Sequence, residues 1–233
     1  NVNKTLLLMG NGPSVKNVDF IKLKSSKIDT FGLNAAYRIY KKLDWYPTYF
    51  GCFDYVVTDS HKENFQGLIN NSPIHKFFFI REYFTGDKFT HCKLQGGNFI
   101  TNPISKDFNS FYDSGNSGVN ACEVAIMMGY TKILLIGIDQ NYTEVVEGAT
   151  RGSGGGLIME STPDLNPNYW FDDYQRKGDR YNYPQLNTFQ KPAWESFSKK
   201  AKNQGIEIVN CSPISTLECF PKSTLEQEIP NYG

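Results

Sequence analysis

Residues 117–139 read SGVNACEVAIMMGYTKILLIGID, and this stretch gives the clearest indication of the fold. Apolar residues recur at helical spacing from Val119 to Met128, and Gly129 is a residue type that commonly ends a helix. Ile133–Ile136 is an unbroken apolar run, typical of a strand buried in a parallel sheet. The stretch therefore predicts a helix followed by a strand, which ends at Gly137-Ile138-Asp139.

The same kind of strand, ending in a polar residue, is predicted earlier in the chain. The predicted strands are Thr5–Met9, Ile28–Gly32 and Tyr49–Phe53. Asn11, Asn34 and Asp54 follow their ends. Because open α/β sheets bind ligands at the carboxyl ends of their strands, these three side chains indicate a site at one sheet edge. Taken one by one, each could instead cap a helix.

Two segments offer backbone N–H groups to a phosphate. Gly10-Asn11-Gly12-Pro13-Ser14 is a glycine-rich turn directly after the first strand, and Ser117-Gly118 heads the predicted helix. The third glycine of the dinucleotide fingerprint and the Gly-Lys-Ser/Thr of a P-loop are absent, which disfavours NAD and P-loop ATP binding. At Ser117-Gly118 the alternative is a serine N-cap with a glycine for close packing. Both interpretations stay open.

Composition excludes several classes of protein. The 233 residues contain 24 Lys and Arg against 24 Asp and Glu, so no global field attracts nucleic acid or anionic lipid. We expect no nucleic-acid partner. No apolar run approaches the roughly 20 residues of a membrane-spanning helix. Five scattered cysteines without a CxxC pair indicate neither disulfides nor zinc, and they favour a cytoplasmic location.

A long segment, about 143–192, lacks a regular pattern. It includes the glycine-rich run 152–156 and the aromatic, acidic stretch Asn166–Tyr174. Such a segment within a compact domain is usually a lid or binding loop, and aromatic faces suit sugar rings and nucleobases. Residues 1–233 are therefore expected to form one domain with a lid-like insertion. After it we predict a helix, a strand and a helical turn: Pro192–Asn203, Ile206–Val209 and Ser215–Phe220.

Several motifs, in this order, resemble those of the bacterial lipo-oligosaccharide sialyltransferases of glycosyltransferase family 42. They are residues 10–14, Phe31-Gly32-Leu33-Asn34, residues 117–130, Gly137-Ile138-Asp139 and residues 211–217. The similarity is dense around residues 10–14 and 117–139, and it extends to a looser group of 6-hydroxymethylpterin diphosphokinase-like proteins.

The resemblance implies an α/β, Rossmann-like domain, with an open, mostly parallel sheet, helices on both faces and an irregular lid over a CMP-sugar donor. It implies a glycan acceptor and neither metal nor cofactor. A location at the inner membrane face, by peripheral association, is compatible with it.

The resemblance also implies roles for individual residues. Asn11 would face the donor phosphate or ribose, Asn34 would bind the nucleotide or sugar, and Ser117 with Gly118 would contact the nucleotide or the sugar carboxylate. Asp54 stands where the family has Asn, and Tyr142 lies near a family tyrosine that supports the leaving phosphate. The implied donor-binding set is Gly10, Asn11, Gly12, Pro13, Ser14, Asn34, Asp54, Ser117, Gly118, Asp139 and Tyr142.

The chain departs from the family at the general base. The family uses a histidine on the lid side, whereas all three histidines here, His61, His75 and His91, precede Ser117. A general base must reach the acceptor hydroxyl and have a pKa near the working pH. Location alone makes four side chains candidates: Asp172, Asp173, Tyr181 and Tyr183.

Three functions follow from these patterns. The first is a metal-independent glycosyltransferase that moves a sugar, including sialic-acid-like sugars, from a CMP donor to a glycan hydroxyl. The second is a diphosphokinase-like enzyme in which Asp54, Asp139 and lid carboxylates hold Mg²⁺. No basic cluster supports it, although the lid contains Arg151, Arg176, Lys177 and Arg180. The third is a nucleotide- or glycan-binding module without catalysis, suggested by the missing histidine.

Overall fold

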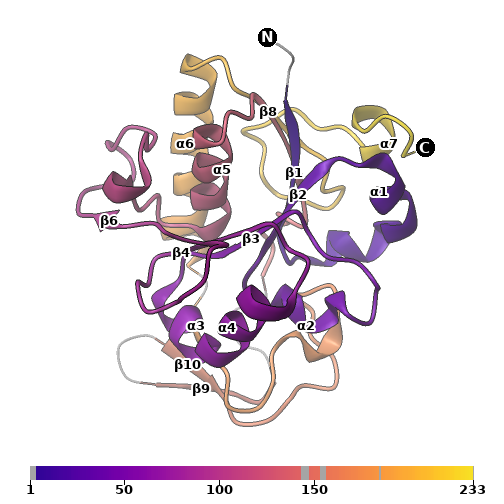
Figure 1. The fold of residues 1–233 in the computed structure, drawn as a ribbon, viewed down its shortest axis with the longest axis vertical. Helices are drawn as coiled ribbons and strands as arrows, with labels where there is room; N and C mark the ends of the chain where they lie inside the picture. Colours follow the sequence, from indigo (N-terminus) through magenta and orange to yellow (C-terminus); the bar gives the residue numbers. More distant parts are fainter. Residues whose placement is uncertain (1–3, 143–146, 153–155, 184, 233) are drawn as a thin grey trace.

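Seven parallel strands form the central sheet, in the order β12-β8-β1-β2-β3-β4-β5 (Figure 1). The computed structural model describes residues 4–142, 147–152, 156–183 and 185–232. The chain runs outward from β1 on one side and then returns to β8 on the other, so the strand order reverses beside β1. The strands are β1 (Thr5–Met9), β2 (Asp29–Leu33), β3 (Tyr49–Cys52), β4 (Lys76–Phe79), β5 (Phe89–His91), β8 (Lys132–Ile136) and β12 (Glu207–Asn210).

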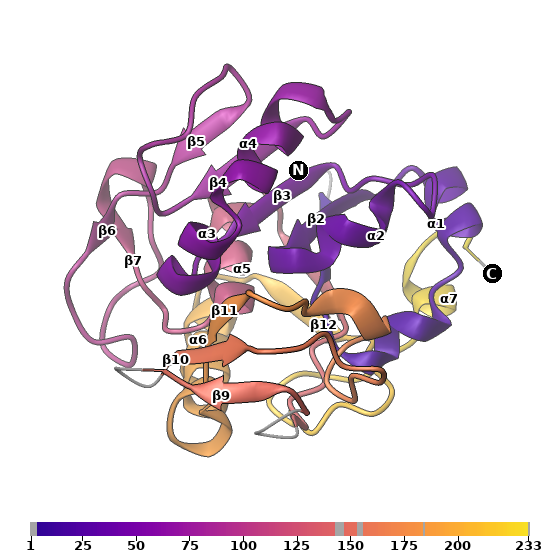
Figure 2. The same ribbon diagram turned by 90° about the horizontal axis from the view of Figure 1, so that it is seen from below.

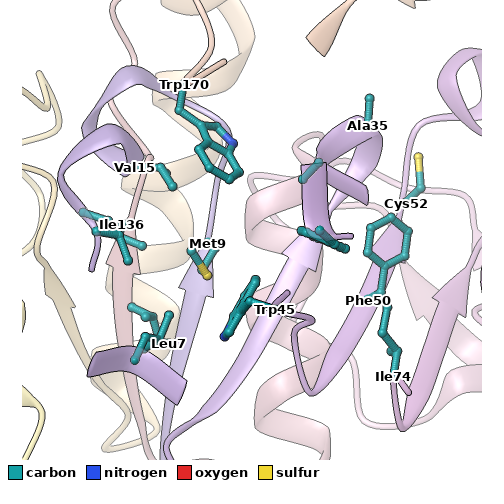
Figure 3. Close-up of a cluster of buried hydrophobic side chains, with 14 of the residues drawn as sticks. Leu7, Met9, Val15, Ala35, Trp45, Phe50, Cys52, Ile74, Ile136 and Trp170 are labelled. Carbon is teal, nitrogen blue, oxygen red and sulfur yellow. The ribbon is translucent and has the colours of Figure 1, made fainter. Parts of the chain in front are cut away.

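Both faces of the sheet are buried, which explains the unbroken apolar runs of its strands. In β1, Leu7 and Met9 point into one core, and Leu6 and Leu8 point into the other. Figure 3 shows Leu7 and Met9 in the first core together with Trp45 and Phe50.

Helices cover each face. The first core is covered by α1 (Phe20–Ser26), α2 (Tyr37–Tyr40), α3 (Tyr55–Ser60), α4 (Lys62–Asn71) and α7 (Leu225–Glu228). The second is covered by α5 (Ser117–Met127) and α6 (Lys191–Asn203), which lie side by side (Figure 1). The α/β class, with a mostly parallel sheet and helices on both faces, is confirmed. None of the helices in the described ranges is long and apolar enough to cross a membrane.

The sequence located most sheet strands to within a residue or two, but it missed others. β4 and β5 were not predicted, nor was the small sheet formed by β6 (Leu94–Gln95) and β7 (Phe111–Tyr112). The helical turn predicted over Ser215–Phe220 is wrong, because this segment is not helical. The last helix is α7, which begins where the Thr224 side chain accepts a hydrogen bond from the Gln227 N–H.

The predicted lid-like insertion contains a three-stranded antiparallel sheet that the sequence pattern did not reveal (Figure 2). Its strands are β9 (Ala149–Arg151), β10 (Gly156–Met159) and β11 (Arg180–Asn182). Residues 143–146, 153–155 and 184 of the predicted insertion lie outside the described residues. Trp170, Phe171 and Tyr174 are buried and pack into the first core, so this part of the insertion is joined to the body by an apolar contact.

Gly10 directly follows β1 and lies against Gly137 and Ile138, which follow β8. A Cβ at this position would collide with the backbone carbonyl of Gly137 and the side chain of Ile138. By contrast, a Cβ on Gly67 in α4 would meet no atom within 4 Å.

We therefore expect Gly10→Ala to lower the free energy of unfolding by about 2 kcal/mol or more, because backbone must move to admit the methyl group. The control, Gly67→Ala, should raise it by about 0.5–1 kcal/mol, since alanine favours a helix over glycine. Urea denaturation measures both. Equal stability of Gly10→Ala and the unmodified protein would contradict the close approach.

Candidate functional site

A pocket of about 560 Å³ opens at the carboxyl edge of the central sheet, between the strand ends, the start of α5 and the insertion. The sequence-predicted site residues that line it are Gly10, Asn11, Asn34, Asp54, Ser117, Gly118, Tyr142, Tyr181 and Tyr183. The position is the one expected for a ligand site in an open α/β sheet, because the strand order reverses at β1.

The remaining predicted donor-binding residues, Gly12, Pro13, Ser14 and Asp139, do not line the pocket. Asp139 is buried and accepts hydrogen bonds from the Ser14 N–H at 2.8 Å and from the Ser14 hydroxyl. Burial raises the pKa of the Asp139 carboxyl, against the opposing effect of the Ser14 hydrogen bonds. The structure thus places Asp139 behind the glycine-rich turn, where it fixes the shape of the turn that carries Gly10 and Asn11.

Three amide oxygens of pocket-lining residues have no hydrogen-bond partner among the described residues. They belong to Asn11, Asn34 and Gln140, and each is buried. Asn11 is oriented by its own Nδ2, which donates to the Leu33 carbonyl at 3.1 Å. An unpaired buried acceptor costs about 1–3 kcal/mol, so three at one pocket indicate a site whose ligand supplies N–H or O–H donors.

The start of α5 differs from the sequence prediction. Its N-cap is Asn116, whose Oδ1 accepts hydrogen bonds from the N–H groups of Gly118 at 2.8 Å and Val119 at 3.4 Å. A Cβ on Gly118 would lie 2.7 Å from the Trp194 ring, so this glycine permits close packing of α5 against α6. The Ser117 hydroxyl lines the pocket and forms no hydrogen bond within the described ranges, which leaves it for a ligand.

Tyrosines form one wall of the pocket. Tyr169 stacks on Tyr174 with ring centroids 3.9 Å apart, and Tyr142 lies beside Tyr169. Burial raises the pKa of Tyr142 to about 12, and it also raises the pKa of Tyr169, Tyr174 and Tyr181. These phenols therefore stay neutral near pH 7, and as neutral groups they donate hydrogen bonds rather than accept protons.

A buried ion pair holds the insertion against the body. Both terminal nitrogens of Arg38 in α2 donate to the Asp179 carboxylate, at 2.5 and 2.8 Å, and one of them also donates to the Tyr174 carbonyl at 2.7 Å. The two charged side chains are 9% and 12% exposed. No local sequence pattern indicates this pair, because the two residues lie far apart in the chain.

A second contact, at Asp54, joins the insertion to the body. Its Oδ1 accepts hydrogen bonds from the N–H groups of Val56 and Val57 and so caps α3, as the structural alternative expected. Its Oδ2 accepts a hydrogen bond from Asn182 of β11 at 2.8 Å. Asp54 therefore both caps a helix and joins the insertion to the sheet edge.

The structure separates the four candidates for the general base. Asp172 and Asp173 are exposed and do not line the pocket, and Asp173 pairs with Arg176 at 2.6 Å. Tyr181 and Tyr183 line the pocket. Among the described residues, no histidine, lysine or arginine lines it, and no cluster of three or more His, Cys, Asp or Glu side chains is arranged to hold a metal ion.

No protein-family model matches this sequence, and no curated protein matches it. Solved structures match its fold. The sialyltransferase CstII from Campylobacter jejuni, in complex with cytidine-5′-monophosphate, has 20% identity and a TM-score of 0.55, over 99% of this chain and 86% of that chain. The sialyltransferase CST-II in complex with a trisaccharide acceptor and CMP has 20% identity and a TM-score of 0.50, over 98% and 87%.

The MAf glycosyltransferase from Magnetospirillum magneticum AMB-1 has 14% identity and a TM-score of 0.54, and the match covers 97% of this chain and 34% of that chain. At these identities the likeness establishes a shared fold. The resemblance to bacterial sialyltransferases that the sequence motifs indicated is confirmed at that level.

His61 makes the stability of the protein depend on pH, although it does not line the pocket. It is buried against the Phe65 ring, its Nδ1 lies 2.9 Å from the Tyr37 hydroxyl, and its Nε2 lies 3.8 Å from Asp179. Burial lowers the pKa of His61 to about 4, Arg38 adds to this effect, and Asp179 opposes it. Between pH 4 and 6.5 the native state therefore binds fewer protons than the unfolded chain, so stability is lost as the pH falls through this range.

We expect the free energy of unfolding to fall less for His61→Gln than for the unmodified protein between about pH 6.5 and 4.5. The difference should be about 2 kcal/mol, because a pKa unit corresponds to about 1.4 kcal/mol. The control is His75→Gln, which removes an exposed histidine and should leave the pH dependence unchanged. Denaturant titrations at several pH values measure it. Identical slopes for all three proteins would show that His61 is not buried in its neutral form.

Proposed function

We propose that this chain is a glycosyltransferase that binds a CMP-activated sugar in the pocket and transfers the sugar to a hydroxyl of a glycan acceptor. The observation that carries the proposal is the set of unpaired amide oxygens on Asn11, Asn34 and Gln140. Ribose hydroxyls and the cytosine amino group are donors of the kind these acceptors lack. The shared fold supports it, since CstII was solved with CMP and CST-II with CMP and a trisaccharide acceptor.

Neutral hydrogen-bond donors would stabilise the leaving phosphate. As the bond to the sugar breaks, negative charge develops on the phosphate oxygen, and donors fixed in position around it lower the barrier. The Ser117 hydroxyl and the Tyr142 and Tyr181 phenols line the pocket and suit this role, because burial keeps the phenols protonated. Holding donor and acceptor together would supply the rest of the rate enhancement. We propose no metal in this step.

Asn34 offers a clean test, because its backbone has a φ of 55°, which glycine adopts without strain. Asn34→Gly removes the amide and keeps the backbone, and we expect it to weaken CMP binding about tenfold or more, through loss of a hydrogen bond to the nucleotide. The matched control is Asn231→Gly, another asparagine with positive φ (63°), exposed and outside the pocket. Isothermal titration calorimetry with CMP measures both.

The unmodified protein should also release CMP from CMP-sugars in the presence of EDTA. Absence of CMP binding would overturn the proposal. Binding without release from any CMP-sugar would favour a binding module, and release that depends strictly on Mg²⁺ would contradict the metal-free step.

A further inference from the structure

The proposed transfer requires a group that takes the proton from the acceptor hydroxyl, and the pocket narrows the choice. None of the described residues lining it is a histidine or lysine, and the phenols that line it are weak bases when neutral; burial, by raising the pKa of Tyr142 and Tyr181, keeps those two neutral. The carboxylates that line the described pocket are Asp54 and Asp113. Among the described lining residues, these two carboxylates are therefore the stronger candidates for the base.

Asp54 is already engaged on both oxygens. Its Oδ1 accepts hydrogen bonds from two backbone N–H groups, at 2.8 and 3.1 Å, and its Oδ2 accepts one from Asn182 at 2.8 Å. These bonds leave neither oxygen of Asp54 without a partner. Asp54 therefore has a structural role, because it links the start of α3 to β11.

In Asp113, by contrast, only one of the two carboxylate oxygens is hydrogen-bonded within the described residues. Its Oδ1 accepts hydrogen bonds from the Gly115 N–H at 2.8 Å and from the Asn120 side-chain amide at 3.0 Å, which fix the plane of the carboxylate. Its Oδ2 forms no hydrogen bond within the described part of the chain. The residue is exposed on the pocket lining, in the loop that leads to Ser117. One oxygen is therefore held by two hydrogen bonds, and the other has no hydrogen-bond partner among the described residues.

A buried polar network holds Asn120 in position for its hydrogen bond to Asp113. Asn120, 1% exposed, accepts a hydrogen bond from the Ser114 N–H at 2.8 Å through its Oδ1, which orients its amide toward Asp113. The Ser114 hydroxyl in turn donates to Glu123 at 2.5 Å, and Glu123 also accepts two hydrogen bonds from Ser105. These contacts fix the loop around Asp113, as a reacting group requires.

We propose that Asp113 is the general base of the transfer and that Asn120 is its positioning residue; this inference rests on the proposed glycosyltransferase function. The acceptor O–H bond breaks, and its proton passes to the Oδ2 of Asp113. The acceptor oxygen forms a bond to the anomeric carbon, and the bond from that carbon to the phosphate oxygen breaks. The electron pair of the broken bond leaves with CMP. Asp113 then returns its proton to water.

The test compares Asp113→Asn with Asp107→Asn. Asp107 is a matched control, because it is exposed and accepts a hydrogen bond from the N–H two residues later, as Asp113 does, but it lies outside the pocket. Release of CMP from CMP-N-acetylneuraminate is followed with lactose or water as the acceptor, over a range of pH. The dissociation constant of CMP is measured in parallel.

We expect Asp113→Asn to lower kcat about 100-fold or more, to lose the acidic limb of the pH profile, and to bind CMP as the unmodified protein does. Asp107→Asn should match the unmodified protein in all three measurements.

An Asp113→Asn variant with unchanged kcat and pH profile would overturn the assignment while leaving the glycosyltransferase function intact. Loss of CMP binding in that variant would overturn it too, since Asp113 would then act on the site's structure. An unmodified protein that neither binds CMP nor releases it would overturn the proposed function and this assignment together.

Discussion

The pocket depends on one buried interaction, the ion pair between Arg38 and Asp179. Arg38 lies in α2, just after the carboxyl end of β2, and Asp179 lies just before β11, so the pair joins the sheet edge to the insertion. Loss of one partner would leave the other charge buried without compensation, at a cost of about 3–5 kcal/mol. The same guanidinium fixes the Tyr174 carbonyl, and Tyr174 supports the stack with Tyr169. The tyrosine wall is therefore held in place by a charge pair that does not line the pocket.

Local sequence patterns were sufficient to find the sheet edge and part of the site. Apolar runs marked β1, β2, β3 and β8, and the rule that parallel strands end at one edge brought Asn11, Asn34 and Asp54 to one pocket. The pattern failed where the outcome depended on neighbours in space. Asn116 and Ser117 are both good cap residues, and only the course of the backbone decides that Asn116 caps α5.

Long-range contacts account for the other omissions. Asp113 gains its place from Asn120 and the network behind it, and the pairing of Arg38 with Asp179 spans 141 residues of sequence. Ser14 and Asp139 were both expected to bind the donor, but they are hydrogen-bonded to each other and do not line the pocket. A sequence motif identifies such residues without showing which of them contact a ligand and which hold the turn.

The chain has no net charge, and the described lining of its pocket contains no cationic side chain. An anionic donor would then be held by hydroxyl groups, amides and backbone N–H groups, whose attraction is short-ranged and weakly screened by salt. The two carboxylates of the lining differ in their hydrogen bonds. Both oxygens of Asp54 have partners, whereas one oxygen of Asp113 has none among the described residues.

We propose that uncharged groups of this pocket bind the CMP moiety of the donor. Calorimetric titration of the protein with CMP at about 50 mM and about 500 mM NaCl tests it most directly, because the Debye length shortens by about threefold between these concentrations. We expect saturable binding at both concentrations, with dissociation constants that agree to within about threefold. Weakening of about tenfold or more at the higher concentration, or no saturable binding at either, would contradict it.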